Sequence, residues 1–169
     1  MLAPKGSAFL YCRPNLQNKL EPLIVSWGWN TEQSGFNEKP YYSRFEWLGT
    51  RDPAAYLSIP AALNFLEKHN WGTVQKECHK LALQTMQDIC NFTGIDPIYP
   101  NESYFAQMVT IPLPPISDAV GLKKSLYNRY NIEIPVIEWD SRHFLRLSVQ
   151  GYNSVLDLIA LETALKSLL

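Results

Sequence analysis

The sequence has no block of like charge, no long apolar run and no recognisable leader peptide. Its formal net charge is −1 over 169 residues, so electrostatic attraction to nucleic acid or to an anionic membrane surface is not expected. No stretch approaches the roughly 18 consecutive apolar residues that indicate a transmembrane helix. Hydrophobic residues make up 46% of the chain, which is enough for a proper core and excludes a disordered protein. We expect one domain of ordinary size, or one domain with an appendage.

Cysteine and histidine are also scarce, which limits the chemistry available. The cysteines are odd in number and lack metal-ligand spacing: Cys12, Cys78 and Cys90. They are typical of buried thiols in a reducing compartment, and a cytoplasmic location is the expectation. The histidines are scattered: His69, His79 and His143. We therefore expect no metal site, and no catalytic triad, P-loop or dinucleotide fingerprint can be found.

The first 50 residues contain two apolar stretches and a long irregular segment. Residues 7–12, "SAFLYC", predict a buried strand that follows a tight turn at residues 3–6. Because termini fray unless something holds them, we expect further chain before Met1. A second apolar stretch covers residues 23–29, and residues 30–49 have few periodic signals. A structureless run of that length usually lies over a site or a partner.

The rest of the chain predicts helices and short strands in alternation. Asp52 and Pro53 are typical of a helix start, Pro60 predicts a kink or two abutting helices, and Thr73 is the expected N-cap of a helix that ends at Gly94. The apolar residues of this helix recur at helical spacing and predict one buried stripe: Val74, Cys78, Leu81, Ala82, Thr85 and Ile89. The order that follows is strand, helix, strand, strand, helix. Residues 140–142 should join the two adjacent strands as a short hairpin. The predicted buried face of the last helix consists of Val155, Leu158, Ile159, Leu161, Leu165 and Leu168. Residues 73–169 therefore predict an α+β fold with helices packed on a small, mostly antiparallel sheet.

Two places could bind a ligand. Arg146 alternates with Leu145 and Leu147 in a strand pattern, and a guanidinium on a strand can hold a carboxylate in a bidentate way. An ion pair or a plain exposed sheet face is the alternative. Gly49 and Thr50 precede a helix start, where a close backbone approach, a hydroxyl and a helix N-terminus suit a phosphate. An ordinary capped helix is the alternative there.

Four stretches together resemble the class V (fold type I) pyridoxal-phosphate (PLP) enzymes, and in particular the isopenicillin N epimerase-like branch. They are "APKGSAFLYCRP", "VSWGW", "FEWLGTRDPAAYLSIPAALNFL" and "LRLSVQGYNSVLDLIALETAL", and they follow the family order over essentially the whole chain. The resemblance implies the C-terminal part of such an enzyme. Residues 1–50 would be the end of the large domain with a dimer-facing loop, and residues 51–169 the C-terminal small domain with its leading helix.

The resemblance also implies roles for the two candidate places. Gly49 and Thr50 would bind the cofactor phosphate in the partner subunit's active site, and Arg146 would take the substrate α-carboxylate. The family's Schiff-base lysine should stand just before Met1, and it is absent. Each lysine of the chain is expected to be a solvated surface charge, so we expect this chain alone to bind no cofactor and to contain no catalytic residue of its own.

Two classes of function remain open. The first is a part of a PLP-dependent epimerase or aminotransferase that acts on an amino acid. The second is a non-catalytic interaction or dimerisation protein derived from that domain. In either case the expected partners are a second copy of the chain or a separate large-domain chain, and neither nucleic acid nor membrane is expected.

Overall fold

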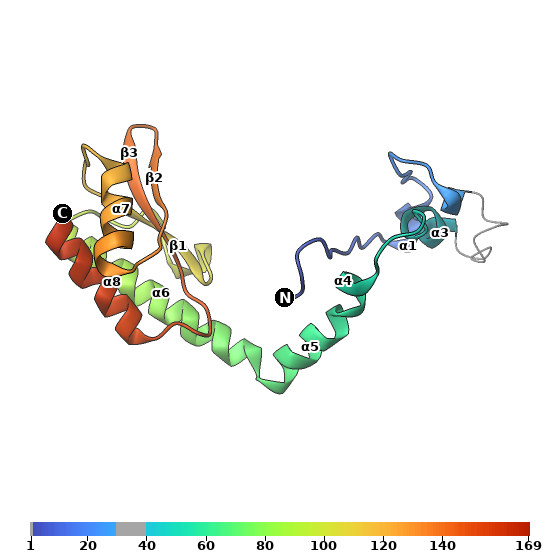
Figure 1. The fold of residues 1–169 in the computed structure, drawn as a ribbon, viewed down its shortest axis with the longest axis horizontal. Helices are drawn as coiled ribbons and strands as arrows, with labels where there is room; N and C mark the ends of the chain where they lie inside the picture. The colour runs from blue at the N-terminus through green and yellow to red at the C-terminus, as the bar shows by residue number, and fades with distance from the viewer. Residues whose placement is uncertain (1, 30–39) are drawn as a thin grey trace. The chain divides into compact units, whose positions relative to one another are not determined.

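The chain divides into two compact units in a computed structural model that describes residues 2–29 and 40–169 (Figure 1). The units are residues 1–69 and 70–169, and each is described by itself. The division that the sequence predicts between residues 50 and 51 concerns the domains of a parent enzyme, and it stays a prediction.

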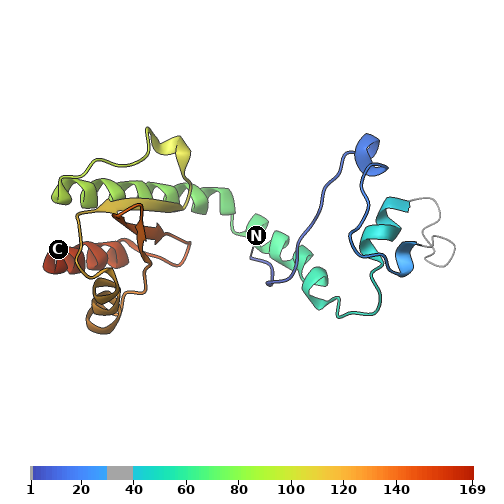
Figure 2. The same ribbon diagram turned by 90° about the horizontal axis from the view of Figure 1, so that it is seen from above.

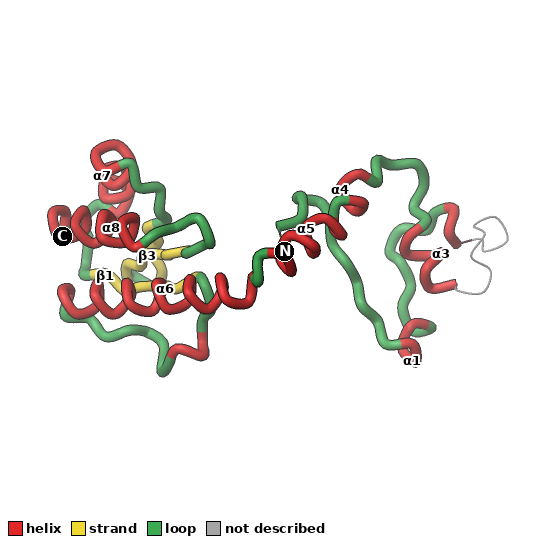
Figure 3. The backbone as a smooth tube through the Cα atoms, turned by 90° about the horizontal axis from the view of Figure 1, so that it is seen from below, coloured by secondary structure: helices red, strands yellow, loops and turns green. Residues whose placement is uncertain are grey.

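The second unit is an α+β domain, which confirms the predicted fold class. Its elements are α6 (Trp71–Thr93), the short 3-10 helix η2 (Glu102–Tyr104), β1 (Met108–Leu113), α7 (Ala119–Tyr130), β2 (Val136–Trp139), β3 (Arg142–Ser148) and α8 (Val155–Leu168). The strands form an antiparallel sheet in the order β1-β3-β2. Helix α6 contacts β1, α7 contacts β2, and α8 contacts both helices. Figures 2 and 3 show α6 running alongside the strands.

Helix α6 forms because its apolar residues recur at helical spacing. The buried positions include Cys78, Ala82, Thr85 and Ile89, which belong to the stripe that the sequence predicts. The helix ends as expected at Gly94, whose φ of 70° is the left-handed cap conformation. Its start is different, because it begins at Trp71 with Asn70 in the N-cap position. The prediction of Thr73 as N-cap is therefore wrong.

The β2–β3 hairpin closes through a two-residue turn, which confirms the predicted short hairpin. Asp140 and Ser141 have φ of 51° and 56°, and two successive residues with positive φ suit the right-handed twist of the strands. In the sheet register Val136 lies opposite Leu145, and Thr110 lies opposite Arg146. Along β3, Leu145 and Leu147 face the core. On the opposite face Arg142 and Arg146 are exposed, whereas Phe144 between them is buried.

Capping residues set the starts of α7 and α8. The carboxylate of Asp118 accepts a hydrogen bond from the Gly121 N–H at 2.7 Å, and the Asp157 carboxylate accepts one from the Ser154 N–H at 2.8 Å. Both contacts satisfy N–H groups that a helix start leaves without partners. The buried face of α8 is narrower than its sequence suggests. It consists of Leu158, Leu161, Ala164 and Leu165, and the predicted members Val155 and Ile159 are exposed.

The core of the second unit lies between the sheet and these helices. Its fully buried members are Ala82, Ile89, Val109, Ile111, Leu126, Leu145, Ala164 and Leu165. They come from α6, α7, α8 and the inner face of β1 and β3. The helices therefore cover this face of the sheet, and the side chains that alternate with the buried ones along each strand point to the opposite face.

The first unit contains short helices and no strand within the residues that the structure describes. They are α1 (Pro14–Gln17), the 3-10 helix η1 (Trp27–Trp29), α3 (Pro40–Glu46), α4 (Ala54–Leu57) and α5 (Ile59–Lys68). Helices α4 and α5 abut at Ser58, so the expectation from Pro60 is confirmed. Pro60 sits in the first turn of α5, where its missing N–H is not needed.

The expected strand at residues 7–12 is wrong. These residues are irregular, and the side chains of Phe9 and Tyr11 are each 76% exposed. A strand is stabilised by hydrogen bonds to a neighbouring strand, and no described segment of this unit pairs with residues 7–12. The apolar pattern is present, but the described residues supply no neighbouring strand to pair with it.

The long irregular segment is also partly helical. Residues 30–39 lie outside the described residues, but residues 40–46 form α3, where no regular structure was expected. The rings of Tyr41 and Phe45, at helical i,i+4 spacing, lie 4.9 Å apart. Helix α3 is fixed to η1 because the Ser43 hydroxyl donates to the Gly28 carbonyl at 2.7 Å and the Gly28 N–H donates to the Trp47 carbonyl at 3.0 Å.

Candidate functional site

Arg146 lies on the central strand of the sheet, on the face that the helices do not cover. Its neighbours Leu145 and Leu147 are buried, and Arg146 is exposed. Its backbone N–H donates to the Pro135 carbonyl at 3.1 Å. Thr110 on β1 lies directly opposite. The strand alternation that the sequence predicts around Arg146 is therefore present, with hydrogen bonds holding the backbone on both sides.

The guanidinium of Arg146 has no partner among residues 2–29 and 40–169. No carboxylate in those ranges lies within ion-pair distance of it, and no side-chain hydrogen bond engages it. The ion-pair alternative is thus not realised in the described part of the chain. A planar cation on a rigid strand is left available to an external anion, and a carboxylate can accept two parallel hydrogen bonds from it.

A cavity of about 350 Å³ adjoins Arg146. Its lining comes from three places: the segment between α7 and β2, the end of β3, and the start of α8. Polar groups in it include Glu133, Ser148, Asn153 and Asp157. Arginine, hydroxyl, amide and carboxylate groups together can bind the charged ends of an amino acid.

Gly49 and Thr50 belong to the first unit, in the turn before α4. Gly49 has φ of 104°, in the range that favours glycine, and a Cβ built there would meet only Ser26 Oγ, at 3.9 Å. The backbone is therefore open to a close approach. Thr50 is exposed, and its hydroxyl has no partner within the described ranges.

The helix after Thr50 contributes less than the sequence suggests. Helix α4 has four residues and begins at Ala54, with Pro53 as N-cap. The Asp52 carboxylate already accepts the hydrogen bond of the Ala54 N–H at 2.8 Å. A single turn has little macrodipole, and an adjacent carboxylate repels an anion. The case for a phosphate here therefore rests on Gly49 and Thr50, without the helix.

Arg51 is a candidate that sequence reasoning missed. Its guanidinium carbon lies 4.9 Å from the centre of the Tyr56 ring, and its Nη2 donates to the Glu46 carbonyl at 3.1 Å. It follows Thr50 directly and lines a hollow of about 640 Å³ together with Phe9, Tyr41 and other residues of the first unit. The signal in the sequence is its adjacency to Thr50, since a phosphate site gains from a nearby cation.

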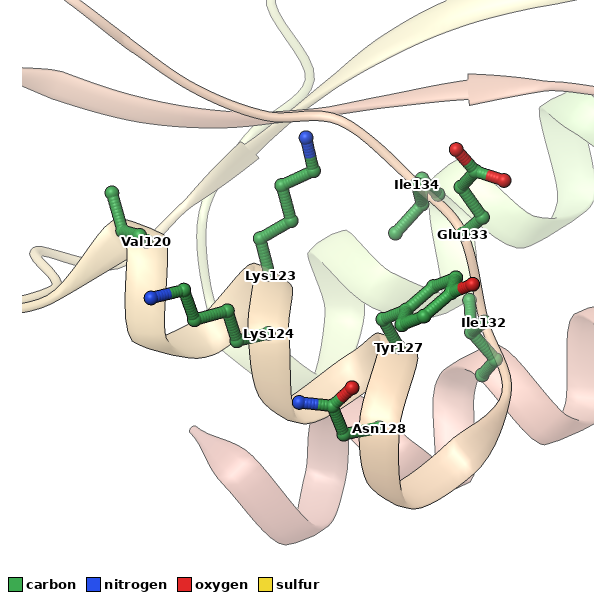
Figure 4. Close-up of a pocket in the computed structure, with 8 residues that line it drawn as sticks. All are labelled: Val120, Lys123, Lys124, Tyr127, Asn128, Ile132, Glu133 and Ile134. Atoms are coloured by element: carbon green, nitrogen blue, oxygen red, sulfur yellow. The ribbon is translucent and has the colours of Figure 1, made fainter.

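A further cavity, about 310 Å³, lies along α7 and the segment after it (Figure 4). Lys123, Lys124 and Tyr127 come from the helix, and Glu133 and Ile134 from the following segment. None of the predicted site residues lines it. In the described residues there is no cluster of three or more residues with metal-binding side chains, and no helix there is long and apolar enough to cross a membrane.

The structure defines a class of protein: an α+β domain whose three-stranded antiparallel sheet carries, on the face away from the helices, an exposed arginine without a partner among the described residues. The solved structures that resemble the chain include the 8-amino-7-oxononanoate synthase from Francisella tularensis. It matches with a TM-score of 0.52 and 16% identity over 85% of this chain and 39% of that chain. At that identity the likeness concerns the fold alone, and it is the fold of a fold type I PLP enzyme domain.

Comparison of sequences gives the family. The model of the aminotransferase class-V family matches residues 1–159. The isopenicillin N epimerases of Amycolatopsis lactamdurans and Streptomyces clavuligerus are 30% and 32% identical to this chain over 99% of its length, and the match covers 44% of each. A probable chloroplastic L-cysteine desulfhydrase of Arabidopsis thaliana is 29% identical over 98% of the chain and 37% of its own length. The chain belongs to the aminotransferase class-V family.

The predicted family and its isopenicillin N epimerase-like branch are thereby confirmed. The chain spans less than half the length of these relatives. What the relatives do as whole enzymes is therefore a matter of proposal for this chain.

Proposed function

We propose that the chain is the C-terminal part of a PLP-dependent amino-acid epimerase or aminotransferase, of the isopenicillin N epimerase type. In this proposal it supplies the contact for the substrate α-carboxylate and a contact for the cofactor phosphate. The observation that carries the proposal is the Arg146 guanidinium, exposed on β3 and without a partner in the described residues. An enzyme that acts on amino acids needs such a cation, because every substrate carries the same α-carboxylate.

Arg146 would orient the substrate. A bidentate pair between its guanidinium and the α-carboxylate fixes the carboxylate plane and limits rotation of the α-carbon. Because the β3 backbone is hydrogen-bonded on both sides, the position of the arginine is set by a rigid element. The cofactor, when bound, supplies an electron sink for chemistry at the α-carbon.

Gly49 and Thr50 would hold the phosphate of PLP. The residues fit this group, because the positive φ of Gly49 opens the backbone and Thr50 offers a free hydroxyl and an N–H. Arg51 adds a positive charge next to them. By the family resemblance this contact reaches the active site of a partner subunit, so we include a dimer in the proposal.

In this proposal, none of the lysines of this chain anchors the cofactor. A lysine of that kind is desolvated and held in line with the cofactor. The lysines at described positions are all exposed: Lys5, Lys19, Lys68, Lys76, Lys80, Lys123, Lys124 and Lys166. Lys39 lies outside the described residues. The anchoring group would then come from another segment or another chain.

A dimerisation role is the second candidate, and the exposed apolar residues of the first unit favour it. Leu23 is fully exposed, and Phe9, Tyr11 and Ile24 are each 76% exposed. Exposed apolar stretches of this kind mark a surface that another chain covers. The occupant would be a second copy of this chain or a large-domain chain. The free state of all three cysteines agrees with a cytoplasmic setting.

Two substitutions test the proposed roles in a protein whose large domain is supplied in cis or in trans. Arg146→Lys keeps the charge but loses the planar fork, so substrate use should weaken by about 1–3 kcal/mol while cofactor binding barely changes. Thr50→Ala should have the opposite signature, with weaker cofactor binding and unchanged substrate dependence at saturating cofactor. A cofactor titration and a substrate titration distinguish the two. Unchanged substrate dependence in Arg146→Lys would refute the assignment.

A further inference from the structure

Helix α7 has an exposed face on which two lysines stand among apolar side chains. Val120, Lys123, Lys124 and Tyr127 are spaced i, i+3, i+4 and i+7 along the helix, so they share one face. The buried residues of α7 lie on a different side and pack into the core. Val120 is 63% exposed and Tyr127 is 58% exposed. This face of α7 therefore combines positive charge with accessible apolar surface.

The segment that follows α7 makes this face one wall of a cavity. Asn131 caps the helix with φ of 57°, in the left-handed region, and the Ile132 N–H donates to the Leu126 carbonyl at 3.0 Å. The cap turns the chain back, so that residues 132–134 and α7 together line a cavity of about 310 Å³, the α7 cavity (Figure 4). Ile134 is 5% exposed and belongs to the core, so this wall is fixed by packing.

The two ammonium groups of the α7 cavity have no anionic partner among the described residues. No carboxylate of residues 2–29 and 40–169, Glu133 of the same lining included, lies within ion-pair distance of Lys123 or Lys124. The lining thus carries two positive charges and one negative charge. Such a lining attracts an anion, and it favours one negative charge over two.

The size and the walls of the α7 cavity suit a small ligand with a flat apolar body. A volume of about 310 Å³ is at the lower end of the range of small-molecule sites. An exposed aromatic ring such as that of Tyr127 can stack on another ring. A lysine ammonium pairs with a carboxylate without demanding one fixed geometry. A ring that bears one carboxylate meets all three conditions.

The α7 cavity is separate from the cavity beside Arg146, although residues 132–134 line both. Arg146 lines only the second cavity, and Lys123, Lys124 and Tyr127 line only the first. A ligand in the α7 cavity would contact the segment that also borders the candidate substrate site. It would not compete for Arg146.

We propose that the α7 cavity binds a small aromatic carboxylate. The ring of the ligand lies against Tyr127 and the apolar side chains beside it, and its carboxylate pairs with Lys123 and Lys124. The inference does not rest on the proposed function, because it uses none of the residues to which a role was given there.

The test uses the full chain and needs no cofactor. The probes are 4-phenylbutyrate and 4-phenylbutyramide, which have the same ring and chain but differ in charge. Binding is followed by the backbone amide signals of the ¹⁵N-labelled protein during titration. Both probes should shift signals of residues 120–134. The acid should bind about fivefold more tightly than the amide, the upper range for an ion pair at a surface.

The double variant Lys123→Gln, Lys124→Gln should abolish the fivefold preference while the amide still binds. The double variant Lys76→Gln, Lys80→Gln is the matched control, because it removes two charges from exposed positions of one helix that do not line the α7 cavity. The preference should persist in this control. Tyr127→Ser should weaken both probes alike, because it removes the ring on which they stack.

Arg146→Lys distinguishes the α7 cavity from the cavity beside Arg146. Residues 132–134 line both cavities, so their signals alone cannot separate the two, but binding of the acid in the α7 cavity should be unchanged by this substitution. Four results overturn the inference: no binding of either probe, equal binding of both, a preference that survives the loss of Lys123 and Lys124, and a preference that is lost in Arg146→Lys.

Discussion

The two units of the chain use their apolar residues in opposite ways. In residues 70–169 the helices and the sheet bury a continuous core, with Ile111 and Leu145 fully enclosed. In the described part of residues 1–69 only Gly28 and Ser43 are buried. The first unit is as rich in apolar side chains as its sequence suggests, but none of those at described positions is buried. An apolar sequence pattern specifies a packed structure only where the same chain also supplies the surface against which those side chains pack.

The largest expected difference between the units is in thiol reactivity. Cys12 is partly exposed, whereas Cys78 and Cys90 are buried, and burial, followed by the nearby Asp96 charge, raises the pKa of Cys90. A buried thiol reacts only after the structure opens, which costs several kcal/mol. A disulfide reagent at neutral pH should therefore modify Cys12 about a thousandfold faster than the other two. Peptide mapping after timed quenching measures this, and comparable rates for all three would contradict the account.

The second largest difference between the units should be in the free energy of unfolding that is lost when an apolar side chain is truncated to alanine. Leu145→Ala removes a fully buried side chain and should lower the free energy of unfolding by about 2–5 kcal/mol. Phe9→Ala removes a larger side chain that is 76% exposed within the chain. At concentrations too low for dimerisation it should change the free energy of unfolding by less than about 0.5 kcal/mol. Urea denaturation followed by circular dichroism compares them. A large loss in Phe9→Ala would mean that a partner copy covers this residue in solution.

Gly28→Ala tests the close contact between η1 and α3 in the first unit. An added Cβ would overlap the carbonyl of Ser43, so η1 and α3 would have to separate at a cost of about 1–3 kcal/mol to that contact. Amide hydrogen exchange should become faster in residues 40–47 and stay unchanged in β3. Gly72→Ala is the control, because nothing lies within 4 Å of its added Cβ.

The smallest effect concerns Glu162 on α8. Burial, followed by repulsion from Asp88, raises the pKa of Glu162, and Lys166 lowers it in part. An acid with a raised pKa in the folded state binds more protons folded than unfolded, so its ionisation destabilises the fold as pH rises above the ordinary value. Glu162→Gln should therefore stabilise by about 0.5 kcal/mol at neutral pH. The gain should vanish in acid, as thermal unfolding across pH would show.

The sequence predicts the second unit well because its signals are local. The stripe of α6, the glycine cap at Gly94, the two-residue hairpin and the alternation around Arg146 each depend on residues within a few positions of one another. Helix periodicity and turn chemistry report such features directly. The site residue Arg146 could be identified as exposed on a strand for the same reason.

The first unit could not be predicted in the same way. The pattern at residues 7–12 is that of a strand, but a strand also requires a neighbour that no local pattern reveals. Helix α3 was missed because its Tyr41 and Phe45 pair was read as part of an irregular segment. Arg51 was missed because its importance comes from its contacts with Tyr56 and Glu46, which only the folded chain brings together.

The central claim is that this chain supplies contacts for substrate and cofactor but not the lysine that anchors the cofactor. The most direct test is to incubate the purified chain with PLP, reduce with borohydride and map the modified peptides by mass spectrometry. The account predicts only partial, scattered modification of surface lysines and no epimerase or transaminase activity. A stoichiometric adduct at one defined lysine would contradict it.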